Sequence, residues 1–281
     1  MLNASPSQPD ALPEGTNPLP VEVITTLPAR VPPRQTPLLF IHGAWHGAWC
    51  WAEHFLPYFS DHGYASHALN LRGHGKSPIR GSVRFARIHD YVADVEEAVA
   101  QLPTAPVLIG HSMGGFIIQK YLERHTMPAA ILLASPPPTG VRGAALRLAR
   151  LDFRSLALVN LRMSLYPPVD TPEKMRRLLF SADMPDDLVK EYFGKLQDDS
   201  YIGYLDMLLF ALPDPTRVKT PLLVLGAADD QNFSITEIEA TARAYHAPYE
   251  IFPNMAHDMM LEQGWEEVAA RIATWLQSRG I

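Results

Sequence analysis

The fold is decided by residues 106–125, which read PVLIGHSMGGFIIQKYLERH. An apolar run, Val107–Ile109, leads into Gly110-His111-Ser112-Met113-Gly114, and a helix-compatible stretch, Gly115–His125, follows. This order is typical of a nucleophile elbow, where a serine occupies a strained strand-to-helix turn and small residues flank it. The new helix also directs backbone N–H groups toward any oxyanion that forms there. The stretch therefore predicts Ser112 as a nucleophile.

Outward from this stretch, short apolar runs alternate with helical patterns from Pro37 onward, which predicts βαβ units around a mostly parallel sheet. The expected strands are Leu38–Ile41, Ala65–Leu69, Val107–Ile109, Ile131–Ala134, Leu222–Leu225 and Tyr249–Phe252, preceded by Val21–Leu27. The expected helices are His89–Leu102, Gly115–His125, Ile235–Tyr245 and Glu262–Gln277. The predicted fold class is α/β, with helices on both faces of the sheet in three layers.

The alternation fails between Pro136 and Pro213, where the apolar pattern is helical. We therefore expect a flexible Pro-rich tail over residues 1–18, a core over 19–135 and 214–281, and a helical lid or cap over 136–213. The first part of this insertion is basic, with five arginines against Asp152 between Pro136 and Leu165. A solvated helix face and a site for an anionic substrate or lipid headgroup are both open interpretations.

A serine hydroxyl needs a base and an orienting acid before it becomes a useful nucleophile near pH 7. In folds with this elbow the chain order is Ser, then Asp or Glu, then His. Asp229 follows the predicted strand Leu222–Leu225, and His257 follows Tyr249–Phe252. Catalytic groups gather at such carboxyl ends of strands. We predict Ser112, Asp229 and His257 as catalytic residues.

The loop after the first buried strand reads His42-Gly43-Ala44-Trp45-His46-Gly47-Ala48-Trp49. An acyl-transfer site needs two backbone donors, one from the residue after the nucleophile and one from this early loop. We assign the oxyanion hole to Ala44 and Met113. We place Trp45, Gly43 and His42 along the substrate pocket, with His42 hydrogen-bonded to the loop backbone.

Together with Asn70-Leu71-Arg72-Gly73-His74-Gly75-Lys76-Ser77, these motifs resemble the α/β-hydrolase superfamily, and more narrowly its lid-bearing serine esterases and lipases. The resemblance covers the chain from about Leu19 to its end. The family spacing Gly226-x-x-Asp favours Asp229 over its neighbour Asp230 as the acid. The loop lacks the HGGG form of one lipase branch and is also similar to plant hydroxynitrile lyases and methyl esterases.

The resemblance implies a serine hydrolase that cleaves carboxylic esters through an acyl-enzyme, with an apolar acyl or alcohol group in its substrate. The alternatives are C–C hydrolysis, perhydrolysis or cyanohydrin cleavage by the same triad, and a non-catalytic small-ligand receptor. Fluorophosphonate labelling of Ser112 separates a receptor from an enzyme.

Composition excludes other classes. The 281 residues carry a net charge of −6, so we expect no nucleic-acid partner. We expect no cofactor and no metal, because Gly75-Lys76-Ser77 lacks the Walker A spacing and the one cysteine, Cys50, provides no thiol pair. We also expect no signal peptide and no membrane span, which favours a cytoplasmic location. The sequence leaves the oligomeric state open.

Overall fold

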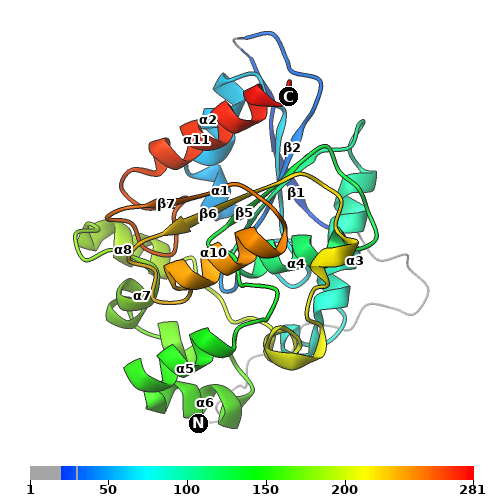
Figure 1. The fold of residues 1–281 in the computed structure, drawn as a ribbon. Helices are drawn as coiled ribbons and strands as arrows, with labels where there is room; N and C mark the ends of the chain where they lie inside the picture. The colour runs from blue at the N-terminus through cyan, green and yellow to red at the C-terminus, as the bar shows by residue number, and fades with distance from the viewer. Residues whose placement is uncertain (1–19, 30) are drawn as a thin grey trace, which may run out of the picture.

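The computed structural model describes residues 20–29 and 31–281, so the predicted tail over residues 1–18 lies outside the described residues. A seven-stranded sheet forms the centre, in the order β1-β3-β2-β4-β5-β6-β7 (Figure 1). Only β1 runs antiparallel to its neighbour, and the other neighbours are parallel. The strands are β1 Val23–Thr26, β2 Leu38–Ile41, β3 Ser66–Leu69, β4 Val107–His111, β5 Ala130–Leu133, β6 Leu222–Ala227 and β7 Tyr249–Phe252.

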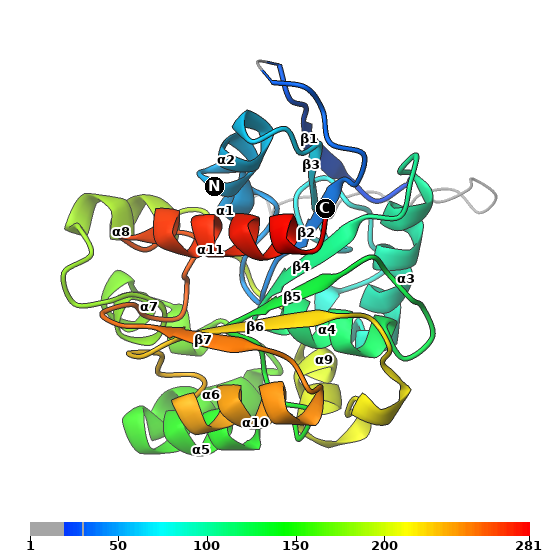
Figure 2. The same cartoon turned by 45° about the horizontal axis from the view of Figure 1, so that its top comes forward.

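Helices cover both faces of the sheet, giving three layers (Figure 2). The core helices are α1 Trp49–Ala52, α2 Phe55–Asp61, α3 Ile88–Ala100, α4 Met113–Tyr121, α10 Ile235–Ala244 and α11 Trp265–Ser278. Successive residues of a central strand enter different cores: Phe40 packs with α1, α2 and α11, whereas Leu39 and Ile41 pack with α3, α4 and α10. This division follows from the two-residue period of a strand buried on both faces.

The segment between β5 and β6 contains helices but no strand, as predicted. It comprises α5 Arg142–Leu151, α6 Phe153–Arg162, α7 Pro172–Leu179, α8 Asp186–Phe193 and α9 Tyr201–Leu205, with a π-helical turn at Asp206–Phe210 and short 3₁₀ turns at Pro167–Val169 and Pro215–Arg217. A further 3₁₀ turn, Val83–Phe85, precedes α3. Figure 1 shows α5 and α6 side by side at one end of the molecule.

The predicted α/β fold is confirmed, and every predicted strand is present within one or two residues of its expected bounds. The sequence missed α1 and α2. Helix α4 begins at Met113, two residues before the expected start, because the chain turns directly at Ser112. Helix α11 begins at Trp265 rather than Glu262, since the preceding residues form turns that end at Gly264 with a φ of 87°.

Gly114 sets how closely α4 approaches β2. A Cβ at this position would lie 2.3 Å from the backbone oxygen of Ile41, which the sheet holds in place. We therefore expect Gly114→Ala to lower the free energy of unfolding by about 1–3 kcal/mol or more, through overpacking. Gly194 is the control, because it has helical backbone angles and its added Cβ would meet no atom closer than 3.4 Å. Urea denaturation tests this; equal effects of the two substitutions would contradict the packing argument.

Candidate active site

Ser112 lies at the junction of β4 and α4 with φ 49° and ψ −121°, a conformation that side-chain-bearing residues seldom adopt. Its backbone N–H donates to the carbonyl of Leu133 at 3.0 Å, and its own carbonyl accepts from Phe116 N–H at 3.1 Å. These bonds hold the strained turn from the neighbouring strand β5 and from the first turn of α4. A strained backbone conformation persists only where its surroundings hold it, and these bonds do so here. The turn therefore has the geometry expected of a nucleophile elbow.

His257 is buried, and its Nδ1 lies 2.8 Å from Oδ2 of Asp230. The other oxygen of Asp230 accepts from the N–H groups of Asn232 at 2.6 Å and Phe233 at 3.2 Å. The carboxylate is therefore fixed by the turn that follows it and faces the imidazole. A carboxylate on Nδ1 keeps the proton there, which leaves Nε2 as the free base.

The structure corrects the predicted acid, Asp229. Its side chain is exposed and lies on a separate surface hollow with Arg176 and Lys190. The backbone N–H of Asp229 donates to Met255 O at 2.9 Å, and Asp229 lies in the turn that follows β6. The buried Asp230 contacts His257, whereas no hydrogen bond joins Asp229 to His257 in the described part of the chain. The turn after the strand selects Asp230.

His111, which directly precedes Ser112, contacts His257 and so brings Ser112 and His257 close together. The ring of His111 lies 4.7 Å from that of His257, centroid to centroid, and His111 Nε2 is 3.0 Å from the His257 carbonyl. Within the described chain, no hydrogen bond joins Ser112 to His257. Catalytic hydrogen bonds are often long before substrate binds, so the missing hydrogen bond does not exclude Ser112 and His257 as a nucleophile and its base.

Ser112 opens into a cavity of about 100 Å³ whose walls include Ala44, Trp45 and Met113. Among the described residues, neither the Ala44 nor the Met113 backbone N–H has a hydrogen-bond acceptor. The remaining walls are mostly apolar and come chiefly from the segment between β5 and β6. These lining residues are Pro136, Val141, Ala144, Ala145, Leu148, Leu156, Val159, Leu165, Pro168, Leu178, Tyr204 and Met207, with Asn232 and Phe233 from the later core.

His42 and Gly43, which we placed along the substrate pocket from the sequence, do not line the cavity. His42 is completely buried, and its Nδ1 donates to Gly43 O at 2.8 Å while its Nε2 accepts from Leu71 N–H at 3.2 Å. Gly43 packs against His111, where a Cβ would meet Nδ1 at 2.8 Å. Of the three predicted pocket residues, only Trp45 lines the cavity.

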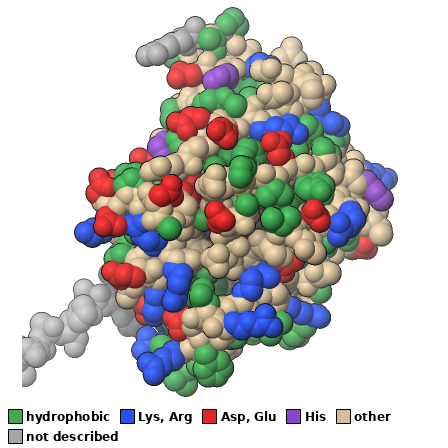
Figure 3. All heavy atoms as spheres, turned by 60° about the vertical axis from the view of Figure 1, so that its left-hand side comes forward, with side chains coloured by type: hydrophobic (Ala, Val, Ile, Leu, Met, Phe, Trp, Pro, Cys, Tyr) green, Lys and Arg blue, Asp and Glu red, His purple; other side chains and the backbone are tan. Residues whose placement is uncertain are grey.

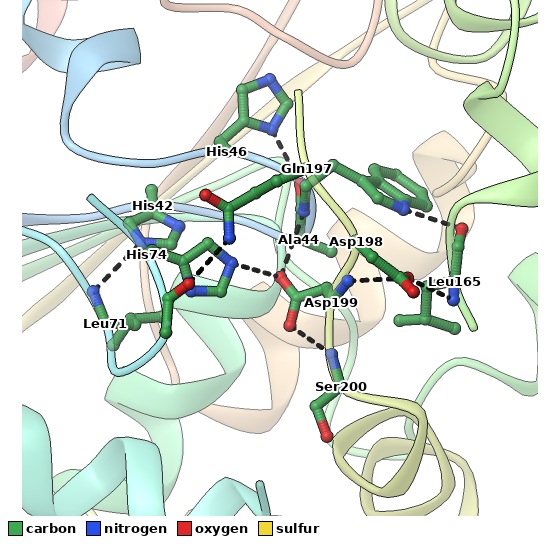
Figure 4. Close-up of polar contacts among 12 residues, drawn as sticks. His42, Ala44, His46, Leu71, His74, Leu165, Gln197, Asp198, Asp199 and Ser200 are labelled. Atoms are coloured by element: carbon green, nitrogen blue, oxygen red, sulfur yellow. Dashed lines mark hydrogen bonds and ion pairs between the residues drawn. The ribbon is translucent and has the colours of Figure 1, made fainter. Parts of the chain in front are cut away.

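A buried carboxylate, Asp199, connects the helical segment to the loop that carries Ala44 (Figure 4). One oxygen accepts from the Trp45 backbone N–H at 3.1 Å and lies 3.2 Å from His74 Nε2. The other accepts from Tyr91 Oη–H at 3.1 Å and from Ser200 N–H at 2.6 Å. Burial opposes a charge on His74, but the Asp199 carboxylate raises the pKa of this imidazole above its usual value.

Trp45 has a φ of 68°, an unfavourable backbone conformation that contacts from outside the loop must hold. Its carbonyl accepts from Gln197 N–H at 3.0 Å, and its indole N–H donates to Leu165 O at 2.8 Å. Gln197 Nε2 also donates to Gly73 O at 2.9 Å. Figure 4 shows the contacts of Gln197, Asp198 and Asp199 with the loops that carry Ala44 and His74 and with Leu165.

A second buried pair supports the same loop from the other side. His46 Nε2 lies 3.0 Å from Asp258 Oδ2, and His46 Nδ1 lies 2.8 Å from Ala44 O. Both ring nitrogens therefore face acceptors, an arrangement that suits the imidazolium. Burial lowers the pKa of His46, but the facing Asp258 carboxylate outweighs it and leaves that pKa raised.

The sequence did not single out Asp199, His46 or Asp258 as parts of the site. The sequence features that point to them are weak. They are an Asp198-Asp199 pair inside the helical segment and a second histidine in the His42–Trp49 loop. Asp230 had a stronger signal, because Asp followed by Asn232, Phe233 and Ser234 is typical of a turn in which the carboxylate accepts from following backbone N–H groups.

One buried group has the residue types of a metal site, namely His111, His257 and Asp258, whose ligand atoms lie within 4.8 Å of one another. Two of its nitrogens are already engaged: His257 Nδ1 faces Asp230, and His111 Nε2 donates to the His257 carbonyl. These two contacts make His111 and Asp230 part of the hydrogen-bonded support of His257.

Comparison with known proteins agrees with this fold. The model of the Alpha/beta hydrolase family matches residues 38–271, and the chain belongs to this family. The structure also resembles an esterase (EaEST) from Exiguobacterium antarcticum, with a TM-score of 0.70 and 18% identity, covering 92% of this chain and 95% of that chain. At this identity, the likeness concerns the fold.

Two curated relatives differ in the activity that their names state. The chain is 25% identical over 241 residues to a non-heme haloperoxidase from Rhodococcus erythropolis, which covers 79% of this chain and 86% of that protein. It is 25% identical over 164 residues to "Probable esterase PIR7A" of Oryza sativa, covering 53% and 62%. Several alignments span only 41% to 62% of the relatives' lengths. No described helix has the length and apolar character needed to cross a bilayer.

The buried His42 generates a pH prediction. Burial, reinforced by the neighbouring His74, lowers the pKa of His42 to about 3, and its Nε2 already accepts from Leu71 N–H. The unfolded chain protonates this imidazole below about pH 6.5, so its contribution to stability is lost as the pH falls from 6.5 toward 3.

We expect His42→Gln to flatten this dependence by up to about 1.4 kcal/mol per pH unit between pH 6 and 4, the value for one proton. Urea denaturation at each pH measures the difference in slope between variant and wild type. His89→Gln is the control, since His89 is an exposed histidine. Parallel curves for His42→Gln and the wild type would show that His42 is not held neutral.

Proposed function

We propose that this protein is a serine hydrolase that cleaves carboxylic esters through an acyl-enzyme. The observation that carries the proposal is the shared cavity of Ser112, Ala44 and Met113, in which two unengaged backbone N–H groups accompany the serine on its strained turn. The buried pair of His257 and Asp230 supplies the base and its orienting acid. Membership of the Alpha/beta hydrolase family and the esterase relative support the same reaction class.

In the proposed mechanism, Ser112 Oγ forms a bond to the ester carbonyl carbon as His257 Nε2 takes the hydroxyl proton. Asp230 holds the tautomer and stabilises the imidazolium. The N–H groups of Ala44 and Met113 bind the carbonyl oxygen as it becomes an oxyanion. Collapse breaks the bond to the alcohol oxygen, which receives the proton from His257. Water then attacks the acyl-enzyme by the same sequence and releases the acid.

The cavity argues for a small apolar group in the substrate. A volume of about 100 Å³ is small for a ligand pocket, since such pockets typically span about 300–1,000 Å³. The walls near Ser112 are apolar, including Leu148, Leu156 and Val159. A short acyl chain fits this space, whereas a long chain requires α5 and α6 to move. We propose residues 136–213 as the lid over the site, because they supply most of the cavity wall.

A second reaction of the same site is perhydrolysis, which the haloperoxidase relative favours. In that reaction hydrogen peroxide replaces water as the nucleophile toward the acyl-enzyme, and a peracid is released instead of the acid. Ester turnover in the presence of peroxide, with the peracid trapped by bromide oxidation, distinguishes the two. Both reactions require Ser112 and His257.

The pair Asp229 and Asp230 provides a sharp test. We expect Ser112→Ala and Asp230→Asn each to lower kcat/KM for p-nitrophenyl acetate by about 10³-fold or more, because the nucleophile is removed or the imidazole loses its required tautomer. Asp229→Asn removes the same charge one residue away and is expected to leave kcat/KM within about twofold. Steady-state kinetics measure this; retained turnover in Ser112→Ala would overturn the proposed mechanism.

Asp199 is proposed as a positioning residue for the oxyanion loop. We expect Asp199→Asn to lower kcat by about 10- to 100-fold with little change in KM, since loss of one oxyanion donor costs about 100-fold or more. His74 also loses its carboxylate, so its pKa should fall, which NMR titration detects. Asp198→Asn changes the adjacent carboxylate for comparison, because Asp198 accepts from Leu165 N–H and Asp199 N–H but has no hydrogen bond to the Ala44 loop. A rise in KM with an unchanged kcat would contradict this role.

A further inference from the structure

Helices α5 and α6 are apolar on two opposite sides. Their inner sides supply Leu148, Leu156 and Val159 to the cavity above Ser112. Their outer sides expose Leu146, Phe153 and Leu161 to solvent at 61%, 70% and 81%. Large apolar side chains exposed to this degree contribute nothing to the core, so their position requires another explanation.

The exposed residues of α6 are arranged along one line. Phe153, Ala157 and Leu161 recur at four-residue spacing and are all exposed, so they form a single stripe along the helix. Leu146 lies on α5, which packs directly against α6. The two helices therefore share one outer surface. We call it the α5–α6 surface and define it by Leu146, Phe153, Ala157 and Leu161.

Arginines surround this surface. Arg142 and Arg150 lie one turn on either side of Leu146, while Arg154 and Arg162 adjoin Phe153 and Leu161 in the sequence. All four side chains belong to exposed residues, and none has a carboxylate within 4.0 Å in the described part of the chain. Figure 3 shows basic and hydrophobic side chains together at the end of the molecule where Figure 1 places these helices.

The nearby acidic groups are already neutralised. Asp152, between the two helices, lies 3.4 Å from Arg177 and bonds Ser155. Glu237 on α10 lies 2.6 Å from Arg147. The four outer arginines thus form a local positive field on a chain whose net charge is −6. A solvated helix face accounts for the arginines, but it does not account for the apolar stripe between them.

We infer that the α5–α6 surface docks on an anionic lipid bilayer. Apolar side chains flanked by arginine are the chemistry that an anionic interface selects, because the side chains enter the headgroup and acyl boundary while the guanidinium groups bind lipid phosphates. Bilayer docking places the lid helices, whose inner sides line the cavity, at the source of poorly soluble esters. Only this last link, to substrate, rests on the proposed function.

The test measures binding to vesicles and needs no turnover. Full-length protein is co-sedimented with vesicles of phosphatidylcholine alone or with 30 mol% phosphatidylglycerol, at low and high salt. We expect binding to the anionic vesicles, weakened by salt, and much weaker binding to phosphatidylcholine. Arg150→Gln/Arg154→Gln/Arg162→Gln should weaken it by about 100-fold, about fivefold for each arginine. The matched control is Arg80→Gln/Arg124→Gln/Arg279→Gln, with the same charge change elsewhere.

The apolar part is tested separately. Phe153→Ser/Leu161→Ser should weaken binding to anionic vesicles by about tenfold or more. The control, Leu27→Ser/Phe85→Ser, alters an exposed leucine and an exposed phenylalanine on other elements. Circular dichroism and turnover of soluble p-nitrophenyl acetate verify that each variant is folded. Because vesicle binding is scored without catalysis, loss of the proposed esterase activity would leave this result readable.

Three outcomes would overturn the inference. One is equal binding by the α5–α6 variants and their matched controls. Another is equal binding to neutral and anionic vesicles, which would remove the role of the arginines. The third is a dimer in light scattering that Phe153→Ser/Leu161→Ser dissolves, because the surface would then bind a second copy of the chain.

Discussion

The turn at Ser112 is the constraint on which the rest of the site depends. Its backbone conformation is unfavourable for a residue with a side chain, so the structure around it must hold it. The support comes from three directions: β5 accepts the Ser112 N–H, α4 begins at the next residue, and Gly114 allows α4 to contact β2. Met113, the next residue, lines the same cavity as Ser112, and its N–H has no acceptor among the described residues. In the proposed mechanism, the nucleophile and one oxyanion donor are therefore neighbours in one constrained turn.

The loop opposite this turn is held by buried charge. Asp199 and Asp258 are completely buried carboxylates, and each faces a buried imidazole. Asp199 also accepts from other donors, whereas Asp258 Oδ1 has no hydrogen-bond partner among the described residues. Isolated buried charges cost several kcal/mol, so such pairs persist where their geometry is satisfied. Asp199 lies in the helical segment, whereas Trp45, whose N–H it binds, lies in the core. A movement of the segment that separated these groups would release the Ala44 loop.

Sequence patterns predicted most of the core because its strands are buried on both faces and read as continuous apolar runs. The positions of Ser112 and His257 after strands β4 and β7 were also predictable, whereas their catalytic roles are a proposal. The choice between Asp229 and Asp230 was not predictable, because both follow β6 and the backbone of the turn, which has no periodic sequence pattern, decides which side chain faces the imidazole. Here the turn through Asn232 and Phe233 decides. Asp199 escaped prediction for another reason: its partners Trp45, His74 and Tyr91 are more than 100 residues away in sequence, and only the folded chain unites them.

The helical segment thus has three tasks with different physical demands. It walls the cavity with apolar side chains, it contacts the Ala44 loop through the buried Asp199, and it exposes Phe153 and Leu161, where we propose that a bilayer docks. The first two tasks tie the segment to the core. The third lies only on α5 and α6, whose exposed residues outnumber their buried ones. Local opening is easiest where few apolar contacts are buried, so α5 and α6 can separate from the cavity while Asp199 stays in place. Such a division would open the cavity while the Ala44 loop keeps its contact with Asp199.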